Sequence, residues 1–287
     1  MSALQTNEEQ LVALGVEASV SHPTWTGSYA VDDHGRPMLL PGMSGVVANV
    51  RVGDLVYPWA ADHLEPAVSA GCADRGRHQA LQFLACLGNA VRVVDGPAAG
   101  AEGTVVGKHA FVLVDFPRAA LDALGPGDRL LVRAHGQGLR LTELPDIHAR
   151  SLSPALLAAL PLRRTGEGRL RVEVTLEIPA HLMGAGLGMS SEWANCDVMF
   201  THPDTVERLG ATGLRLGDVV VMHDQDHRFG RGYRKGMCAV GVVAHGGHGG
   251  IPGHGTGVVT IMSGPSEQFE TVVVERANVG DYLNLPE

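Results

Sequence analysis

The sequence predicts a mainly β fold, in which a small barrel domain with one helix precedes a larger β-sandwich-like domain. Three observations support this fold class. Turn-forming residues recur about every 8–12 residues and separate short β-branched runs. Only one long segment, residues 75–87, has helical periodicity. Residues 169–178 alternate strictly between apolar and polar side chains, as a half-buried strand does.

The first half of the chain contains most of the short strand-like runs. Residues 2–14 are expected to form an arm or a short helix. The strand-like runs that follow are GRPMLLPG, RVGDLVYP, HAFVLVDFP and GPGDRLLVRAHGQG. The helix predicted at 75–87 places Ala80, Phe83, Leu84 and Leu87 on one face, and Gly88-Asn89 should end it. We expect this face to pack against the barrel.

The segment VRVVDGPAAGAEGTVVGKH, residues 91–109, reads as a strand, a tight turn and a strand. It is similar to the hairpin of small SH3-like barrels of the KOW type, which often bind RNA or protein. Few basic residues flank it, so a structural role is favoured here. It ends in Lys108-His109, which places two polar side chains at a strand terminus. We predict that both bind substrate.

Residues 151–165 combine a short helical segment with a proline break, and they form the predicted domain boundary. The expected domains are therefore residues 1–150, with the barrel and its helix, and residues 151–287. The second domain contains the alternating strand, further strands, and loops rich in histidine, aspartate and glycine.

Composition limits the class of protein. The 287 residues have a formal net charge of −9, which argues against a nucleic-acid or anionic-membrane surface. The four cysteines form no CxxC pair and are expected to be buried thiols in a reducing compartment. Neither a secretory signal nor an apolar run of about 18 residues is apparent. We therefore expect a cytoplasmic protein with no nucleic-acid or membrane partner.

Five of the fourteen histidines fall within residues 222–264, together with acids, arginines and many glycines. Buried charges and imidazoles each need a partner, so this stretch cannot be an ordinary hydrophobic core. Its first part follows a strand and enters a loop, where functional residues are often placed. The alternative is a solvated loop with internal salt bridges.

Six polar residues of this first part receive predicted roles. Asp226 and His227 are assigned as an acid/base pair, with Asp224 as a further catalytic or metal-orienting carboxylate. His223 is a candidate metal ligand. Arg228 and Arg231 are expected to hold a carboxylate or phosphate of the substrate.

The second part of the stretch contains three further candidate metal ligands, His245, His248 and His254, on a glycine-rich loop. Histidines that only point to water are the alternative. If the strands that carry His223 and His245 are antiparallel, these residues lie about 26 Å apart at opposite ends of a hairpin. They could meet only through a parallel connection, a sharply bent strand or a neighbouring subunit. We expect a homo-oligomer, in which such a shared site is natural.

Residues 178–200 contain a GxGxG run that lacks the spacing and the following helix of a dinucleotide site, so no nucleotide cofactor is expected. Asn195, just after this loop, is a candidate for substrate binding; a plain polar loop with a buried Trp193 is the alternative. Asp32-Asp33-His34 is interpreted as a turn. Asp62-His63 receives no functional assignment.

Several of these motifs together resemble one family. They are PGMSGVVAN at residues 41–49, the run ending in GTVVGKH, DQDHRFGRGYRKG, and the later GHGTGVVTIM. The chain resembles the bacterial and archaeal proteins grouped as DUF4438, a domain of unknown function, over most of residues 27–263. The resemblance implies a barrel-like and a β-sandwich-like domain and no settled activity. Its recurrent polar motifs correspond to Lys108-His109, residues 224–228, Arg231 and residues 253–255. GKHA stands where GKHGG is expected.

The function predicted from these observations is an enzyme that acts on a small polar or anionic metabolite. Hydrolysis or elimination at an amide-, lactam- or ester-like bond is favoured, so the enzyme would be a hydrolase or lyase. A divalent metal, Zn²⁺, Mn²⁺ or Fe²⁺, is left open, because a His/Asp set suits each of them. Two alternatives remain: a non-catalytic sensor that binds a metal or small molecule, and a KOW-like interaction module.

Overall fold

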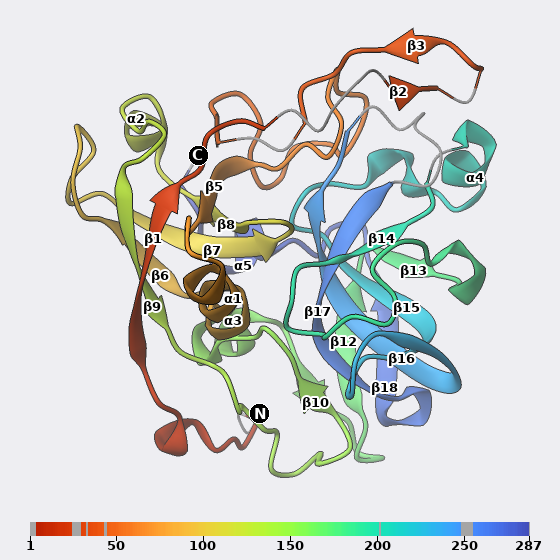
Figure 1. Cartoon of the computed structure of the whole chain (residues 1–287). Helices are drawn as coiled ribbons and strands as arrows, with labels where there is room; N and C mark the ends of the chain where they lie inside the picture. The colour runs from red at the N-terminus through yellow and green to blue at the C-terminus, as the bar shows by residue number, and fades with distance from the viewer. Residues whose placement is uncertain are drawn as a thin grey trace.

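The computed structural model describes residues 4–24, 30–32, 34–42, 45–200, 202–247 and 255–286. Two β-rich units lie side by side, with the barrel strands on the left of Figure 1 and the second unit on the right. The mainly β fold predicted from the sequence is confirmed. No helix in the described part of the chain is long and apolar enough to span a membrane.

The first unit is a closed six-stranded barrel. Its strand order is β1-β9-β6-β7-β8-β5, and β5 pairs back with β1 to close it. These strands are β1 (Leu14–Val20), β5 (Ala67–Gly71), β6 (Ala90–Val93), β7 (Glu102–Lys108), β8 (Val112–Asp115) and β9 (Arg129–Ala134). A short strand, β4 (Val46–Val47), attaches to β5. Alternating side chains fill the barrel, as they do in other small barrels.

The barrel's main helix is α1 (Arg75–Leu84). Asp74 caps its N-terminus by accepting a hydrogen bond from Arg77 N. The helix ends three residues before the predicted limit, because Ala85 adopts an extended conformation. Leu81 is fully buried in the barrel core, whereas Phe83, which the periodicity placed on the inner face, is partly exposed. A second short helix, α2 (Arg118–Leu121), was not predicted.

The second unit is built on a sheet ordered β10-β17-β16-β15-β13, with β14 also paired to β17. Its strands are β10 (His148–Ala149), β13 (Leu176–Ile178), β14 (Cys196–Val198), β15 (Val219–Asp226), β16 (Gly232–His245) and β17 (Thr256–Pro265). A three-stranded sheet of β11 (Arg163–Arg164), β12 (Leu170–Val174) and β18 (Phe269–Val273) shares a hydrophobic core with it. The alternating segment predicted as one strand is thus divided between β12 and β13.

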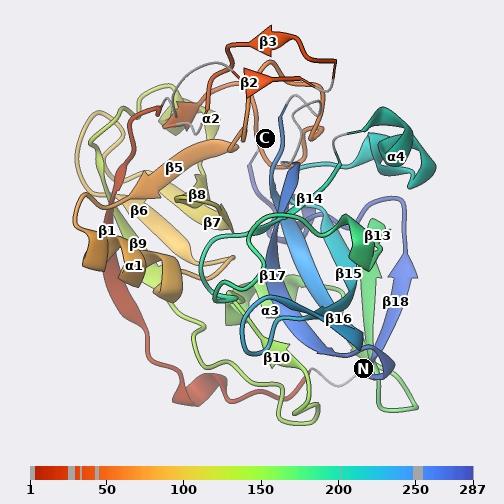
Figure 2. The same ribbon diagram turned by 45° about the vertical axis from the view of Figure 1, so that its right-hand side comes forward.

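Short elements complete the described chain. They are β2 (Ala30–Val31), β3 (Pro37–Met38), α3 (Pro154–Ala159), α4 (Pro203–Arg208), α5 (Val279–Tyr282) and the 3₁₀ turns Glu8–Gln10, Ala180–Leu182, Ala211–Gly213 and Ser266–Gln268. Figure 2 shows β2 and β3 above both units.

The two units share one buried core. Leu87, Val106 and Leu113 of the first unit belong to the same apolar cluster as Val240 and Val242 of the second. A Cβ on Gly107 would lie 3.1 Å from the Ala244 Cβ, so the end of β7 packs closely against the end of β16. This contact brings His109, which follows β7, close to His245, the last residue of β16. The division at residues 150/151 stays a prediction.

Candidate functional site

The hairpin of β15 and β16 places the predicted histidines. The two strands are antiparallel, with Val219 opposite Val242 and His223 opposite Cys238. His223 and His245 therefore lie at opposite ends of the hairpin. His223 is half-exposed, and its Nε2 lies 3.1 Å from Glu177 Oε2. His248 and His254 lie outside the described residues.

The hairpin tip bends back over the sheet. The strand register shifts between His223 and Gln225, and Asp224 at this bulge has a left-handed backbone (φ 54°). Asp224 Oδ1 accepts a hydrogen bond of 2.8 Å from Gly236 N, which stabilises the bend. Beyond it, His227 N donates to Ser263 Oγ of β17. A straight hairpin would carry His227 well past this strand position.

The bend shortens the distance between the two predicted clusters but leaves them on opposite faces. His227 Nδ1 lies 2.6 Å from Thr260 Oγ1, and His245 pairs with Gly257, three residues away on β17. Three strand residues span about 10 Å. Side chains alternate along a strand, and Val258 and Val259 indeed belong to different core clusters. Thr260 therefore lies on the same face of β17 as Val258, whereas Gly257 and His245 lie on the opposite face, which is directed at the barrel.

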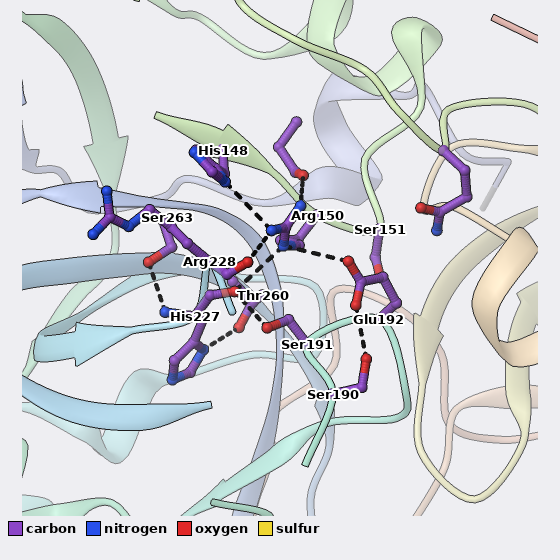
Figure 3. Close-up of polar contacts among 12 residues, drawn as sticks. His148, Arg150, Ser151, Ser190, Ser191, Glu192, His227, Arg228, Thr260 and Ser263 are labelled. Atoms are coloured by element: carbon purple, nitrogen blue, oxygen red, sulfur yellow. Dashed lines mark hydrogen bonds and ion pairs between the residues drawn. The ribbon is translucent and has the colours of Figure 1, made fainter. Parts of the chain in front are cut away.

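Arg150, unpredicted from the sequence, holds the bent tip in place. Its guanidinium donates to the carbonyl oxygens of His227 and Arg228 and forms an ion pair with Glu192 (Figure 3). Ser191 also donates to His227 O. The 190–192 loop and the hairpin tip are thus joined through one arginine.

The predicted acid/base pair does not share a face of the hairpin. Asp226 accepts hydrogen bonds from Arg228 and Arg234, and the Arg228 bond is the main reason that its pKa is lowered to about 2. The neighbouring His227 is fully buried, and burial lowers its pKa to about 3. Adjacent strand residues point to opposite sides, so the two groups face different surroundings. Their joint catalytic role stays a prediction.

A cluster of three histidines forms where the two units meet: His63, His109 and His245. Their ring centres lie 4.3 Å apart for His109–His245, 5.1 Å for His63–His109 and 5.3 Å for His63–His245. His109 follows β7, and His245 ends β16. The contact of Gly107 with Ala244 therefore determines the proximity of these two rings.

His63 arrives from a loop that pairs with the chain after β16. Leu64 N donates to Gly246 O (2.7 Å), and Gly246 N donates to Leu64 O (3.1 Å). His63 itself has φ 49°, a left-handed backbone that is uncommon outside glycine. Such conformations persist only where the surroundings impose them, and they concentrate at functional sites. The Leu64–Gly246 pairing is the local constraint.

Each imidazole of the cluster has a carboxylate beside one ring nitrogen. Asp62 Oδ1 lies 2.8 Å from His63 Nδ1, and Glu65 Oε1 lies 2.7 Å from His109 Nδ1. Asp197 Oδ1 lies 3.3 Å from His245 Nε2. Glu65 is fully buried, and Ser69 Oγ donates to its second oxygen. Such carboxylates orient imidazoles and make the opposite ring nitrogen a better ligand.

His245 is the most enclosed member of the cluster. It is fully buried, and burial, followed by the proximity of His109, lowers its pKa to about 4, so the ring is neutral at pH 7. Asn195 Nδ2 lies 3.0 Å from its Nε2 and donates to Asp197 Oδ1 (2.8 Å). Within the described part of the chain, His245 Nδ1 has no hydrogen-bond partner. Nε2 can either accept from the Asn195 amide, with the proton on Nδ1, or donate its proton to Asp197, in which case Nδ1 carries a free lone pair.

Gly257 makes room for this arrangement. A Cβ at that position would lie 2.1 Å from His245 Nε2 and 2.2 Å from Asn195 Nδ2. Any side chain there would displace the imidazole or the amide. Gly257 is therefore needed for the close packing of His245 and Asn195 and not for a turn.

The spacing of the three rings can be compared with that around a metal. Imidazoles that bind one Zn²⁺ at roughly 2.1 Å have ring centres about 5 Å apart. The observed separations are close to this value. Among the described residues, no group of three ligands already surrounds a metal position. His63 and His109 are stacked with 8° between their ring planes, so at least one ring would need to turn together with its carboxylate to direct the nitrogens at a common point.

Lys108, beside His109 in the sequence, is fully buried and donates three hydrogen bonds. The acceptors are Gln82 O at 2.6 Å, Ser151 Oγ at 2.9 Å and Glu192 O at 3.0 Å. Burial lowers its pKa to about 8. Three N–H groups are all that an ammonium has. The lysine thus links helix α1 to the segment at Ser151, between the two units, and to the loop at Glu192. Its predicted contact with substrate stays a prediction.

Two family models match the chain. One, described as the N-terminal part of the domain of unknown function DUF4438, matches residues 29–158, and its C-terminal counterpart matches residues 159–283. The chain belongs to the DUF4438 family. The family predicted from the sequence motifs is thereby confirmed. No curated protein matches the chain.

A solved structure similar to this DUF4438 protein is titled "Crystal structure of TM1086". It is 38% identical, with a TM-score of 0.92, and the match covers 98% of this chain and 99% of that chain. This likeness spans both the barrel and the second unit, so the mainly β fold holds for both proteins.

The structure brings together three of the predicted site residues, His109, Asn195 and His245. It adds His63, Glu65 and Asp197, which were not predicted as site residues. Asp62-His63-Leu64-Glu65 had one usable signal, namely acids and an imidazole within a short segment. A single such segment is common in turns, and only the fold shows that it meets two other histidines.

Proposed function

We propose that this protein is an enzyme that binds a divalent metal at His63, His109 and His245. Its reaction would be hydrolysis or elimination at an amide-, lactam- or ester-like bond of a small polar molecule. The observation that carries the proposal is that three neighbouring imidazoles each have a carboxylate on one ring nitrogen. A buried imidazole always needs a hydrogen-bond partner, but a neutral oxygen is enough, as Thr260 Oγ1 is for His227. Carboxylates beside all three rings are instead the arrangement found around metal-binding histidines.

The chemistry of the donor set supports a borderline metal such as Zn²⁺, Mn²⁺ or Fe²⁺. Neutral imidazoles suit these ions, and the lowered pKa keeps His245 neutral. A metal held there would polarise a substrate carbonyl and acidify bound water. Glu65 and Asp197 hold His109 and His245 in orientation. Asp62, more exposed than Glu65, is the group best placed to exchange protons with solvent.

The test is metal-dependent turnover. Metal-free protein, prepared with EDTA, would be supplied with Zn²⁺, Mn²⁺ or Fe²⁺ and assayed by chromatography and mass spectrometry for products formed from a panel of small amides, lactams and esters. We expect activity that returns with one of the metals in wild-type protein and in His181→Gln, an exposed control. His109→Gln should be inactive. Activity in His109→Gln equal to wild type would refute the assignment.

The same experiment separates the enzyme from a sensor. Metal that binds with a defined stoichiometry but supports no turnover of any substrate class would favour the non-catalytic binding protein. Of the few basic residues at or near the KOW-like hairpin, Lys108 is buried and Arg118 pairs with Asp122, so these two give the KOW-like alternative no additional support.

A further inference from the structure

The bent tip of the β15–β16 hairpin holds three buried polar side chains on one face: Gln225, His227 and Arg231. Their exposed fractions are 1%, 0% and 2%. Gln225 and His227 are two residues apart and therefore share a face. Asp226 pairs with Gly232, and the same register places Arg231 directly opposite His227. Opposed side chains of this kind have Cβ atoms about 5 Å apart.

Most polar atoms of this group have no hydrogen-bond partner in the described part of the chain. They are both amide atoms of Gln225, Nε2 of His227, and Nε and Nη1 of Arg231. Figure 3 shows the ring of His227 pointing away from Arg150 and toward Thr260. Buried polar groups in native proteins are almost always paired. So many unpaired atoms on one face indicate a site that a further polar group completes.

Arg231 determines the charge of that group. A guanidinium remains protonated even when buried, and a buried charge requires a partner. Its Nη2 donates to Trp193 O at 3.0 Å, but no described carboxylate lies within ion-pair distance of it. Burial lowers its pKa, and the more distant Cys196 and Asp197 offset this only in part. The carboxylate of Asp226 is held by Arg228 and Arg234. That of Asp197 is held by His245 and Asn195 on the barrel face of the sheet.

The loop over the hairpin tip limits the size of the group. Gly188 N donates to Arg231 O, and Arg231 N donates to Met189 O. Gly186 has φ 88°, and a Cβ there would lie 2.8 Å from Asn195 O and 3.3 Å from Arg231 Nη1. The backbone thus passes directly over the guanidinium. Any group that binds beside this guanidinium must therefore be small.

We propose that Gln225, His227 and Arg231 form an enclosed binding site for a small oxyanion with one negative charge, of the size of bicarbonate or acetate. Arg231 and the amide nitrogen of Gln225 donate to its oxygens. Gln225 Oε1 accepts a hydrogen bond from an anion that carries a proton, which favours bicarbonate. This site is separate from the three-histidine cluster, because Thr260 and Gly257 direct the two toward opposite faces of the sheet.

The test is thermal denaturation in sodium bicarbonate, sodium acetate or sodium phosphate, each at constant ionic strength against sodium chloride. Binding at ten times Kd should raise Tm by about 3 °C and then saturate. Arg231→Gln should abolish the rise, and Gln225→Leu should weaken it at least tenfold in concentration. Arg92→Gln, which removes an exposed arginine on β6, should behave as wild type.

A direct measurement covers the case in which Arg231→Gln does not fold. Wild-type protein would be desalted and heat-denatured, and the released anions quantified by ion chromatography with inorganic carbon analysis. About one anion per chain supports the site, and its identity distinguishes bicarbonate from a carboxylate or phosphate. No released anion together with no saturable rise in Tm would overturn the proposal and leave the site to water. An equal rise in Gln225→Leu would also overturn it.

Discussion

His227 should make the folded protein sensitive to acid. Its pKa falls from 6.5 to about 3, chiefly through burial and secondly through Arg231. The unfolded chain therefore takes up a proton near pH 6.5 that the folded chain accepts only near pH 3. The contribution of neutral His227 to the free energy of unfolding is complete above pH 6.5 and is lost as the pH falls toward 3. Between pH 7.5 and pH 5.0 the loss is about 2 kcal/mol of unfolding free energy.

The variant His227→Gln isolates this effect. Glutamine does not titrate and can still form a hydrogen bond with Thr260 Oγ1, the present partner of His227 Nδ1. Urea unfolding followed by tryptophan fluorescence would be measured at pH 7.5 and 5.0 for wild type, His227→Gln and the exposed control His181→Gln. The His227→Gln variant should lose about 2 kcal/mol less than the other two. An equal loss in all three proteins would refute the reasoning.

Four further results are expected. In wild type the free energy of unfolding should rise by about 2 kcal/mol between pH 7.5 and 9.5, because buried Lys108, with a pKa near 8, loses its proton at lower pH than it does in the unfolded chain. Lys108→Met should not show this rise, and urea unfolding at both pH values measures it. Glu65→Gln should weaken metal binding about 10–100-fold, measured by titration against a chelator, while the partly exposed Asp62→Asn should weaken it less. Gly257→Ala should also reduce metal binding, since its methyl group would overlap His245 Nε2; unchanged binding would contradict the geometry. Arg150→Met should lower the unfolding free energy by about 2 kcal/mol and expose the hairpin tip to proteolysis, whereas Arg92→Met should do neither.

The fold could be predicted from local patterns. Glycine and proline between β-branched runs indicate turns between short strands, and these runs became the barrel and the long hairpin. Closure of the barrel could not be predicted. It requires β5 to pair with β1, with Ser19 opposite Gly71, and these strands meet only when all six strands have formed the sheet. The end of α1 was misplaced because tertiary packing turns Ala85 into an extended conformation.

The site was predictable only in part, for a reason of geometry. His109, Asn195 and His245 carry recognisable signals, but their proximity depends on the packing of Gly107 against Ala244 and the pairing of Leu64 with Gly246. Such contacts between distant segments leave no periodicity in one sequence. The bulge at Asp224 similarly places Gln225 and His227 apart from His223, although strict alternation would put all three on one face.

The metal content of the purified protein tests the central claim most directly. Metal-stripped wild type, His245→Gln and His181→Gln would be incubated with equimolar Zn²⁺, Mn²⁺ or Fe²⁺, desalted and analysed by mass spectrometry of the elements. A metal site at His63, His109 and His245 predicts about one retained ion per chain in wild type and His181→Gln and a large loss in His245→Gln. Retention that is absent from all three proteins, or equal in all three, would contradict it.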